Sequence, residues 1–146
     1  MSQVAEFLAA VLPRLKTADT ALHNGDPRPR KAMWAHSDPV TLFGAVWTAA
    51  GWAEVGPTFE RLASSLSNCE SFEYEVLAAD ARGDLAYIVG IERTTASIRG
   101  APPRRYELRV TTILRREGGE WKVVHRHGDP MPDSESTRTQ LARLAE

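Results

Sequence analysis

The segment GEWKVVHRH, residues 119–127, says more about the fold than any other part of this chain. From Trp121 to His127, every second side chain lies on the same face of an extended backbone, as in a strand with two unlike faces. The turn residues Glu117-Gly118-Gly119 come directly before it, and residues 104–116 form another run with strand character. We therefore predict a β-hairpin made of two long strands.

The strand pattern continues toward the N-terminus. Residues 85–98 are rich in β-branched side chains, and in residues 71–76 apolar or aromatic side chains alternate with polar ones. The turn Arg82-Gly83-Asp84 separates these two runs, and a loop at residues 100–103 leads into the hairpin. The second half of the chain thus predicts four consecutive strands of an antiparallel sheet.

The first half has the spacing of helices. Apolar side chains recur every three or four positions over residues 2–23, where Pro13 is expected to kink or divide the helix. A short helix is predicted over residues 27–34, a brief strand over 40–43 and a third helix over 51–67. Helices followed by consecutive strands indicate an α+β fold, with the helices packed on one face of the sheet.

Four segments resemble the SnoaL-like branch of the nuclear transport factor 2-like superfamily: MWAHSDPVTLFG (33–44), GDLAY (83–87), LRVT (108–111) and GEWKVVHRH (119–127). The last segment is also similar to the association domain of calcium/calmodulin-dependent kinase II. The resemblance covers about residues 15–130 and implies a cystatin-like α+β barrel. In this cone, a strongly curved antiparallel sheet wraps around N-terminal helices and leaves a pocket open at one end. We expect one SnoaL-like domain over residues 1–130, followed by a tail or short helix over 131–146.

Composition limits the classes of function. The chain has 146 residues, a formal net charge of -1 and a single cysteine, Cys69. Without a positive field to attract phosphates, we expect no nucleic-acid partner. No apolar run is long enough to span a membrane and the start lacks a secretory signal, so we expect a cytoplasmic protein without membrane contact. One cysteine cannot form an internal disulfide, and no ligand motif supports a metal or another cofactor.

The family register predicts the polar end of the pocket. It turns Arg109, Thr111 and His127 into the cone, with His125 on the same strand face as His127. Arg109 would bind a carboxylate or enolate through its fork of donors, or would pair with an acidic neighbour such as Glu92. An imidazole at His127 would act as a base or acid near pH 7.

Two further catalytic candidates follow from the resemblance, because isomerases of the superfamily use a carboxylate base with a tyrosine among the oxyanion donors. Asp38 lies just before the first predicted strand, near the place of that base, although an Asp-Pro pair equally suits a turn in which the carboxylate caps backbone donors. Tyr87 is a candidate donor. Glu92 is the only acidic residue within residues 85–98, and it lies either in the pocket, paired with Arg109 or Arg93, or on the solvent face.

Aromatic side chains cluster in the first half of the chain. Trp34, Trp47 and Trp52, three of the four tryptophans, lie close together in sequence with Phe43 between them. Such large apolar groups either line a ligand cavity or fill the core. We assign them as candidate ligand-binding residues, together with Glu92.

These residues suggest a small-molecule-binding protein, with an apolar or carboxylate-bearing ligand and a homodimer formed through the open sheet. If the protein is an enzyme, it is an isomerase or cyclase that acts next to a carbonyl group of an apolar substrate. His127 would then be the base or acid, and Arg109 and Tyr87 would stabilise the oxyanion. The alternative is a non-catalytic ligand-binding or dimerisation module, since the fold alone does not decide function.

Overall fold

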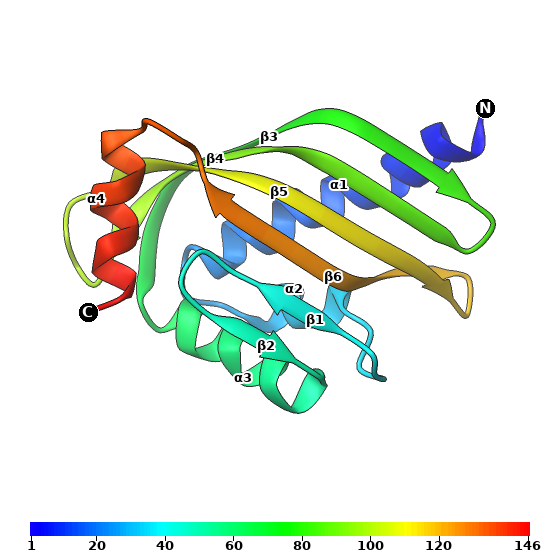
Figure 1. Cartoon of the computed structure of the whole chain (residues 1–146), viewed down its shortest axis with the longest axis horizontal. Coiled ribbons are helices and arrows are strands. Elements are labelled where there is room, and N and C mark those ends of the chain that lie inside the picture. The colour runs from blue at the N-terminus through cyan, green and yellow to red at the C-terminus, as the bar shows by residue number, and fades with distance from the viewer.

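The fold is an α+β cone, described for all 146 residues by a computed structural model (Figure 1). The four helices and six strands are α1 (Gln3–Leu22), α2 (Arg28–Met33), β1 (Thr41–Phe43), β2 (Thr48–Ala50), α3 (Trp52–Ala63), β3 (Leu66–Arg82), β4 (Leu85–Ile98), β5 (Arg104–Glu117), β6 (Glu120–Pro130) and α4 (Glu135–Leu144). None of the helices is both long enough and apolar enough to cross a membrane.

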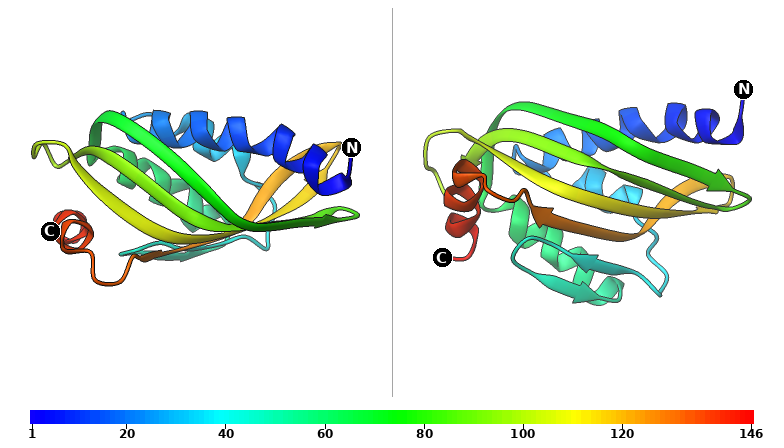
Figure 2. Two further views of the ribbon diagram at one scale, coloured as in Figure 1. Left: turned by 90° about the horizontal axis from the view of Figure 1, so that it is seen from above. Right: turned by 45° about the horizontal axis from the view of Figure 1, so that its top comes forward.

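The strands form one curved sheet in the order β2-β1-β6-β5-β4-β3. Neighbouring strands are antiparallel, except that β1 runs parallel to β6. The sheet stays open because β2 and β3 form separate edges. Figure 2 shows α1 crossing the inner face of this curve, while no helix covers the middle of the outer face. The predicted α+β fold with helices on one face is confirmed.

Two local predictions differ from the structure. Helix α1 continues through Pro13 as one helix. Pro13 has no backbone N–H, so the carbonyl of Ala9, four residues earlier, lacks its usual hydrogen bond. Both residues are exposed, so water can donate to that carbonyl. Strand β2 was not predicted, because it has only three residues and depends on a turn closed by the hydrogen bond from Gly44 N to Trp47 O (2.8 Å).

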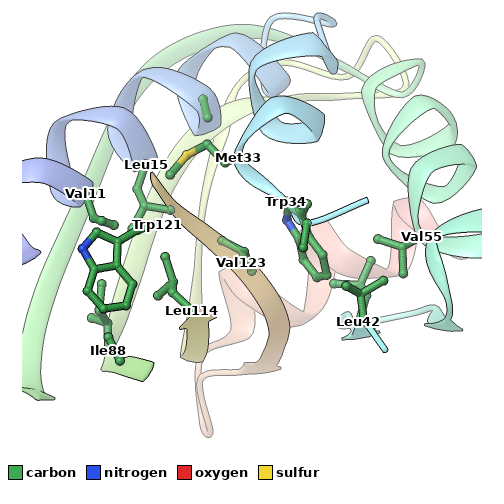
Figure 3. Packing of buried hydrophobic residues seen from close by; sticks show 14 of the residues in the cluster. Val11, Leu15, Met33, Trp34, Leu42, Val55, Ile88, Leu114, Trp121 and Val123 are labelled. Atoms are coloured by element: carbon green, nitrogen blue, oxygen red, sulfur yellow. The ribbon is translucent and has the colours of Figure 1, made fainter. Parts of the chain in front are cut away.

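The main apolar core fills the cone between α1 and the sheet. It contains 18 buried residues, among them Val11 and Leu15 of α1, Trp121 of β6 and Trp34 (Figure 3). A second cluster of nine buried residues lies at the end of the sheet where α4 packs; its members are Leu22, Ala63, Leu66, Ile98, Tyr106, Leu108, Val110, Leu141 and Leu144. Burial of these side chains determines which face of each strand is inside.

A β-bulge in β6 decides which of its polar side chains face the interior. The pairing with β5 shifts between Leu114, which pairs with Val123, and Ile113, which pairs with His125. Val124 is therefore the extra residue, and the alternation of faces is inverted beyond it. Trp121 and Val123 face inward before the bulge, but Arg126 and Gly128 face inward after it.

Candidate functional site

A cavity lies inside the cone and is lined by members of both apolar clusters. It leaves about 60 Å³ for the centres of water-sized atoms. One bound water needs roughly 10–15 Å³ of such space, so the cavity has room for a small ligand. Its apolar lining includes Leu22, Leu42, Val46, Trp47, Phe59, Leu62, Leu108, Leu141 and Leu144. Its polar lining includes His23, Arg30, Tyr106 and Arg126.

His23 and Tyr106 form a hydrogen-bonded pair in this polar lining. His23 is at the end of α1, where its Nδ1 lies 2.7 Å from the backbone carbonyl oxygen of Asp19. A carbonyl oxygen can only accept, so Nδ1 carries the ring proton and Nε2 of the neutral ring is an acceptor. The hydroxyl of Tyr106 donates to Nε2. The pair thus combines an unprotonated ring nitrogen, Nε2, with a hydroxyl group that donates to it.

The ring of His23 is neutral over most of the pH range. Burial lowers its pKa from 6.5 to about 4, although the negative charge of Glu92 opposes the shift. Burial also raises the pKa of Tyr106, so its hydroxyl remains protonated at neutral pH. Both groups are therefore in the protonation states that a proton transfer inside the cavity requires.

Glu92 and Arg126 form a buried ion pair beside these two side chains. Arg126 Nη1 and Nη2 donate to the two carboxylate oxygens of Glu92 at 2.7 and 2.8 Å, and the side chains are only 12% and 5% exposed. Burial by itself raises the pKa of Glu92, but the charge and hydrogen bonds of Arg126 outweigh it and hold the pKa below its ordinary value. The carboxylate is therefore ionised.

Asp19 and Arg30 form a second buried ion pair, which joins α1 to α2. Their side chains are 2% and 6% exposed, and Arg30 Nη2 donates to Asp19 Oδ1. Burial and the positive charge of Arg126 lower the pKa of Arg30. Two carboxylates and two guanidinium groups leave the polar end of the cavity without net charge. Because buried ion pairs are weak contributors to stability, such a group marks a candidate functional site.

Acidification should destabilise the protein through His23. The unfolded chain takes up a proton as the pH falls below about 6.5, while the folded ring stays neutral down to about 4. The free energy of unfolding should therefore fall by about 3 kcal/mol across this window. Urea unfolding at about pH 7.5 and about pH 4.5 measures the change. His23→Gln has no titrating ring and should lose much less; equal losses in both proteins would contradict a neutral buried ring.

Four of the predicted pocket residues lie on the outer face of the sheet instead. Arg109, Thr111, His125 and His127 do come together, because Thr111 pairs with His127 across β5 and β6. However, the inward-facing side chains of β5 are Tyr106 and every second residue after it, which excludes Arg109 and Thr111. On β6, the bulge turns both histidines outward. The prediction that Arg109, Thr111 and His127 point into the cone is therefore wrong.

These outer residues form their own contacts. Arg109 lies 3.8 Å from Asp129, so the predicted pair of Arg109 with Glu92 does not form. His127 Nε2 lies 2.9 Å from Asp129 Oδ1, and His125 Nδ1 lies 2.7 Å from Thr41 Oγ1. Phe43 does not line the cavity; its exposed ring stands edge-on to both imidazoles at 5.4 Å.

Two predicted catalytic residues also lie away from the cavity. Asp38 Oδ1 accepts from the backbone N–H of Trp52 at 2.8 Å, so it caps the start of α3 as an Asp-Pro turn suggests. Tyr87 lies on the outer face and is 43% exposed. Glu92 was correctly singled out as unusual, but its partner is Arg126, which sequence reasoning missed.

The three tryptophans in the first half of the chain have different environments. Trp34 is buried in the main core and packs edge-on against Phe59 at 5.2 Å, so it is a core residue. Trp52 stacks on His36 at 4.0 Å. Only Trp47 lines the cavity, where the guanidinium of Arg61 lies 4.4 Å from its ring centre. One of the four predicted aromatic lining residues is therefore placed at the cavity.

Sequence reasoning also missed Asp19, His23, Arg30 and Tyr106. One signal was present: Asp19 and His23 are four residues apart on the apolar stripe of α1, where a polar side chain is buried with the stripe. Arg30 had no such signal, because it lies in a short basic run. No group of three His, Cys, Asp or Glu side chains is placed to hold a metal ion.

This chain belongs to the family of the SnoaL-like domain, whose model matches residues 15–133. Its curved open sheet wrapped around a helix is the fold of solved proteins described as NTF2-like and ketosteroid isomerase-like.

Solved structures of similar fold come from several bacteria. A candidate scytalone dehydratase from Novosphingobium aromaticivorans DSM 12444 is 13% identical, with a TM-score of 0.72 over 90% of this chain and 97% of that chain. A ketosteroid isomerase-like protein from Erwinia carotovora atroseptica SCRI1043 is 16% identical, with a TM-score of 0.69 over 86% and 97%. A candidate dehydratase of the NTF2-like family from Streptomyces avermitilis is 20% identical, with a TM-score of 0.67 over 87% and 97%. Among curated proteins, none matches this sequence.

Proposed function

We propose that this protein is a lyase or isomerase that removes a proton from the carbon next to a carbonyl group of a small uncharged substrate. The observation that carries the proposal is the His23–Tyr106 pair on the cavity wall, in which a neutral imidazole nitrogen accepts from a hydroxyl. A base and an acid in contact are the parts that such a proton transfer needs. The similar folds of dehydratase and isomerase candidates agree with this reaction class.

The reaction uses both members of the pair. The proton leaves the substrate carbon for Nε2 of His23. The electron pair of the broken C–H bond forms a carbon–carbon double bond, and the π pair of the carbonyl group moves onto its oxygen. The hydroxyl of Tyr106, released from Nε2, then donates to that oxygen, and the guanidinium of Arg126 stabilises its negative charge. The carboxylate of Glu92 stabilises the imidazolium that forms, since its charge favours protonated His23.

The charge balance of the cavity favours an uncharged substrate. The charge of Arg126 is balanced by Glu92 and that of Arg30 by Asp19, so the cavity has no net positive charge to balance a ligand carboxylate. A charged ligand would have to be desolvated without a partner, at a cost of several kcal/mol. Of the two ligand types expected from the sequence, we therefore favour the apolar one, with a single carbonyl or hydroxyl group.

Deuterium exchange tests the proton removal without knowledge of the natural substrate. Small ketones such as butanone are incubated with the protein in D₂O, and loss of the proton signal next to the carbonyl is followed by NMR. The wild-type protein should accelerate the exchange. His23→Gln and Tyr106→Phe should each slow it by about 10²- to 10⁴-fold, the usual contribution of a general acid or base.

His127→Gln is the matched control, because this imidazole lies on the outer face of the same sheet. It should exchange as fast as the wild-type protein. Acceleration that survives in both His23→Gln and Tyr106→Phe would contradict the proposed roles. Ketone binding without any exchange would favour a non-catalytic ligand-binding protein instead.

We also propose that two copies pair through the outer face of the sheet. Tyr87 is 43% exposed there, on the same face of β4 as Val89, and pairs with Ile113 of β5; Phe43 is 42% exposed and lies against His125 and His127. Exposed aromatic and apolar side chains on a sheet face without a covering helix support such an interface. Sedimentation equilibrium should give a dimer for the wild-type protein and for Thr17→Glu, which changes an exposed residue of α1, but a monomer for Tyr87→Glu. A monomeric wild-type protein would rule the pairing out.

A further inference from the structure

The C-terminal helix α4 forms part of the cavity wall although it lies beyond the segment that the SnoaL-like family model matches, residues 15–133. Its Leu141 and Leu144 are 6% and 5% exposed and belong to the cavity lining. Figure 2 shows α4 lying across one end of the sheet. One end of the cavity is therefore formed by side chains outside the matched segment.

Helix α4 is held by specific polar contacts. The side-chain amide of Gln140 is fully buried and donates to the backbone carbonyls of Ala96 and Arg104, at the ends of β4 and β5, at 2.8 and 3.2 Å. Thr137 Oγ1 accepts from the backbone N–H of Glu107 at 3.0 Å. A helix of ten residues is marginal alone in water, so these contacts and the buried leucines define its position.

The two leucines face the cavity without filling it. Space remains beside them, and the other apolar lining comes from α1, α3, the sheet and the β1–β2 turn. Leu141 and Leu144 are the lining residues that α4 supplies, and they form the cavity wall on the side of that helix. Their size therefore determines how far an apolar ligand can extend toward α4.

We infer that α4 is the specificity-determining wall of the site, and that Leu141 and Leu144 set the length of the apolar part of the ligand. This inference rests on the proposed use of the cavity as a ligand site. It does not depend on turnover, because it concerns only which ligands fit.

A series of straight-chain 2-ketones, from propanone to 2-decanone, tests the inference by calorimetric titration. Wild-type affinity should rise about fourfold per added methylene until the chain reaches α4, and then fall. Leu144→Ala and Leu141→Ala each remove three carbon atoms, so each should move this break to longer chains by about three methylenes. Leu144→Phe should move it to shorter chains.

Leu77→Ala is the matched control, because it removes the same atoms from a side chain of β3 that is 60% exposed. It should leave the length preference unchanged. If an alanine variant at α4 unfolds, Leu144→Val, which removes a single carbon, should still move the break by about one methylene.

The possible failures are distinguishable. Ketone binding with the same length preference in Leu141→Ala, Leu144→Ala and Leu144→Phe would overturn the role of α4 but leave the proposed site intact. Absence of ketone binding to every variant would contradict both proposals. A shifted preference without deuterium exchange would support α4 as the specificity wall and contradict only the proposed catalysis.

Discussion

Arg126→Met should lower the free energy of unfolding by about 3–5 kcal/mol, the usual cost of removing one partner of a buried ion pair. The substitution leaves the carboxylate of Glu92, only 5% exposed, without the two hydrogen bonds that now satisfy it. The loss should be greater at neutral than at acidic pH, because protonation of Glu92 relieves the unpaired charge. Urea unfolding at both pH values measures the effect.

Arg109→Met is the matched control. Arg109 and Asp129 form an ion pair on the outer face of the sheet, with side chains 53% and 50% exposed and 3.8 Å apart. An exposed pair of this kind contributes about 0–1 kcal/mol. If Arg126→Met costs no more than Arg109→Met, then the pair of Arg126 with Glu92 is not buried in solution.

The double variant Glu92→Leu/Arg126→Met separates stability from function. Replacing both partners with apolar side chains removes both buried charges, so its stability should equal or exceed that of the wild-type protein. Deuterium exchange of butanone should nevertheless be lost, because the double variant lacks the guanidinium that stabilises the oxyanion. A stable double variant with full exchange activity would show that this ion pair serves no catalytic purpose.

Gly90→Ala should be the second strongly destabilising change, by about 3 kcal/mol. Gly90 is buried in β4, and a Cβ atom there would lie 2.2 Å from the backbone oxygen of Glu75 and 2.6 Å from Cε1 of Tyr74. The ring of Tyr74 thus occupies the space where a side chain at position 90 would lie. Backbone cannot move aside without disturbing the ladder between β3 and β4.

Gly128→Ala is the matched control for this change. Gly128 is also a buried glycine inside a strand, but the atom nearest to its added Cβ, from Leu108, lies at 3.5 Å, an ordinary contact. Urea unfolding should show a change of less than about 1 kcal/mol for Gly128→Ala. Similar losses for the two variants would mean that crowding by Glu75 and Tyr74 does not control position 90.

Most of the fold was predictable from the spacing of side chains. Residues 85–98 were assigned as a strand from their β-branched side chains, and residues 71–76 and 121–127 from the alternation of their side chains; both are local properties. Strand β2 could not be assigned, since three residues carry no period and its pairing with β1 depends on the turn between them. The uninterrupted α1 depends on the solvent exposure of Pro13, which the sequence does not reveal.

The candidate site was much less predictable. Glu92 was recognised because a carboxylate inside an apolar strand is unusual, yet its partner Arg126 was missed, because the predicted alternation placed it on the face opposite to His125 and His127. The alternation through His125 and His127 was extended without the extra residue at Val124, which inverts the faces of β6. Because of this bulge, Arg126 lines the cavity and the two histidines face outward.

The sequence by itself determined the α+β class, the sheet with helices on one face, and the resemblance to the SnoaL-like family. These depend on periods and motifs that are complete within short segments. Only the tertiary structure decided that His23, Arg30, Tyr106 and Arg126 line one cavity, with Asp19 and Glu92 paired to its two guanidinium groups. Each of these polar groups is costly to bury alone and acceptable only beside its partners, which come from other elements far along the chain.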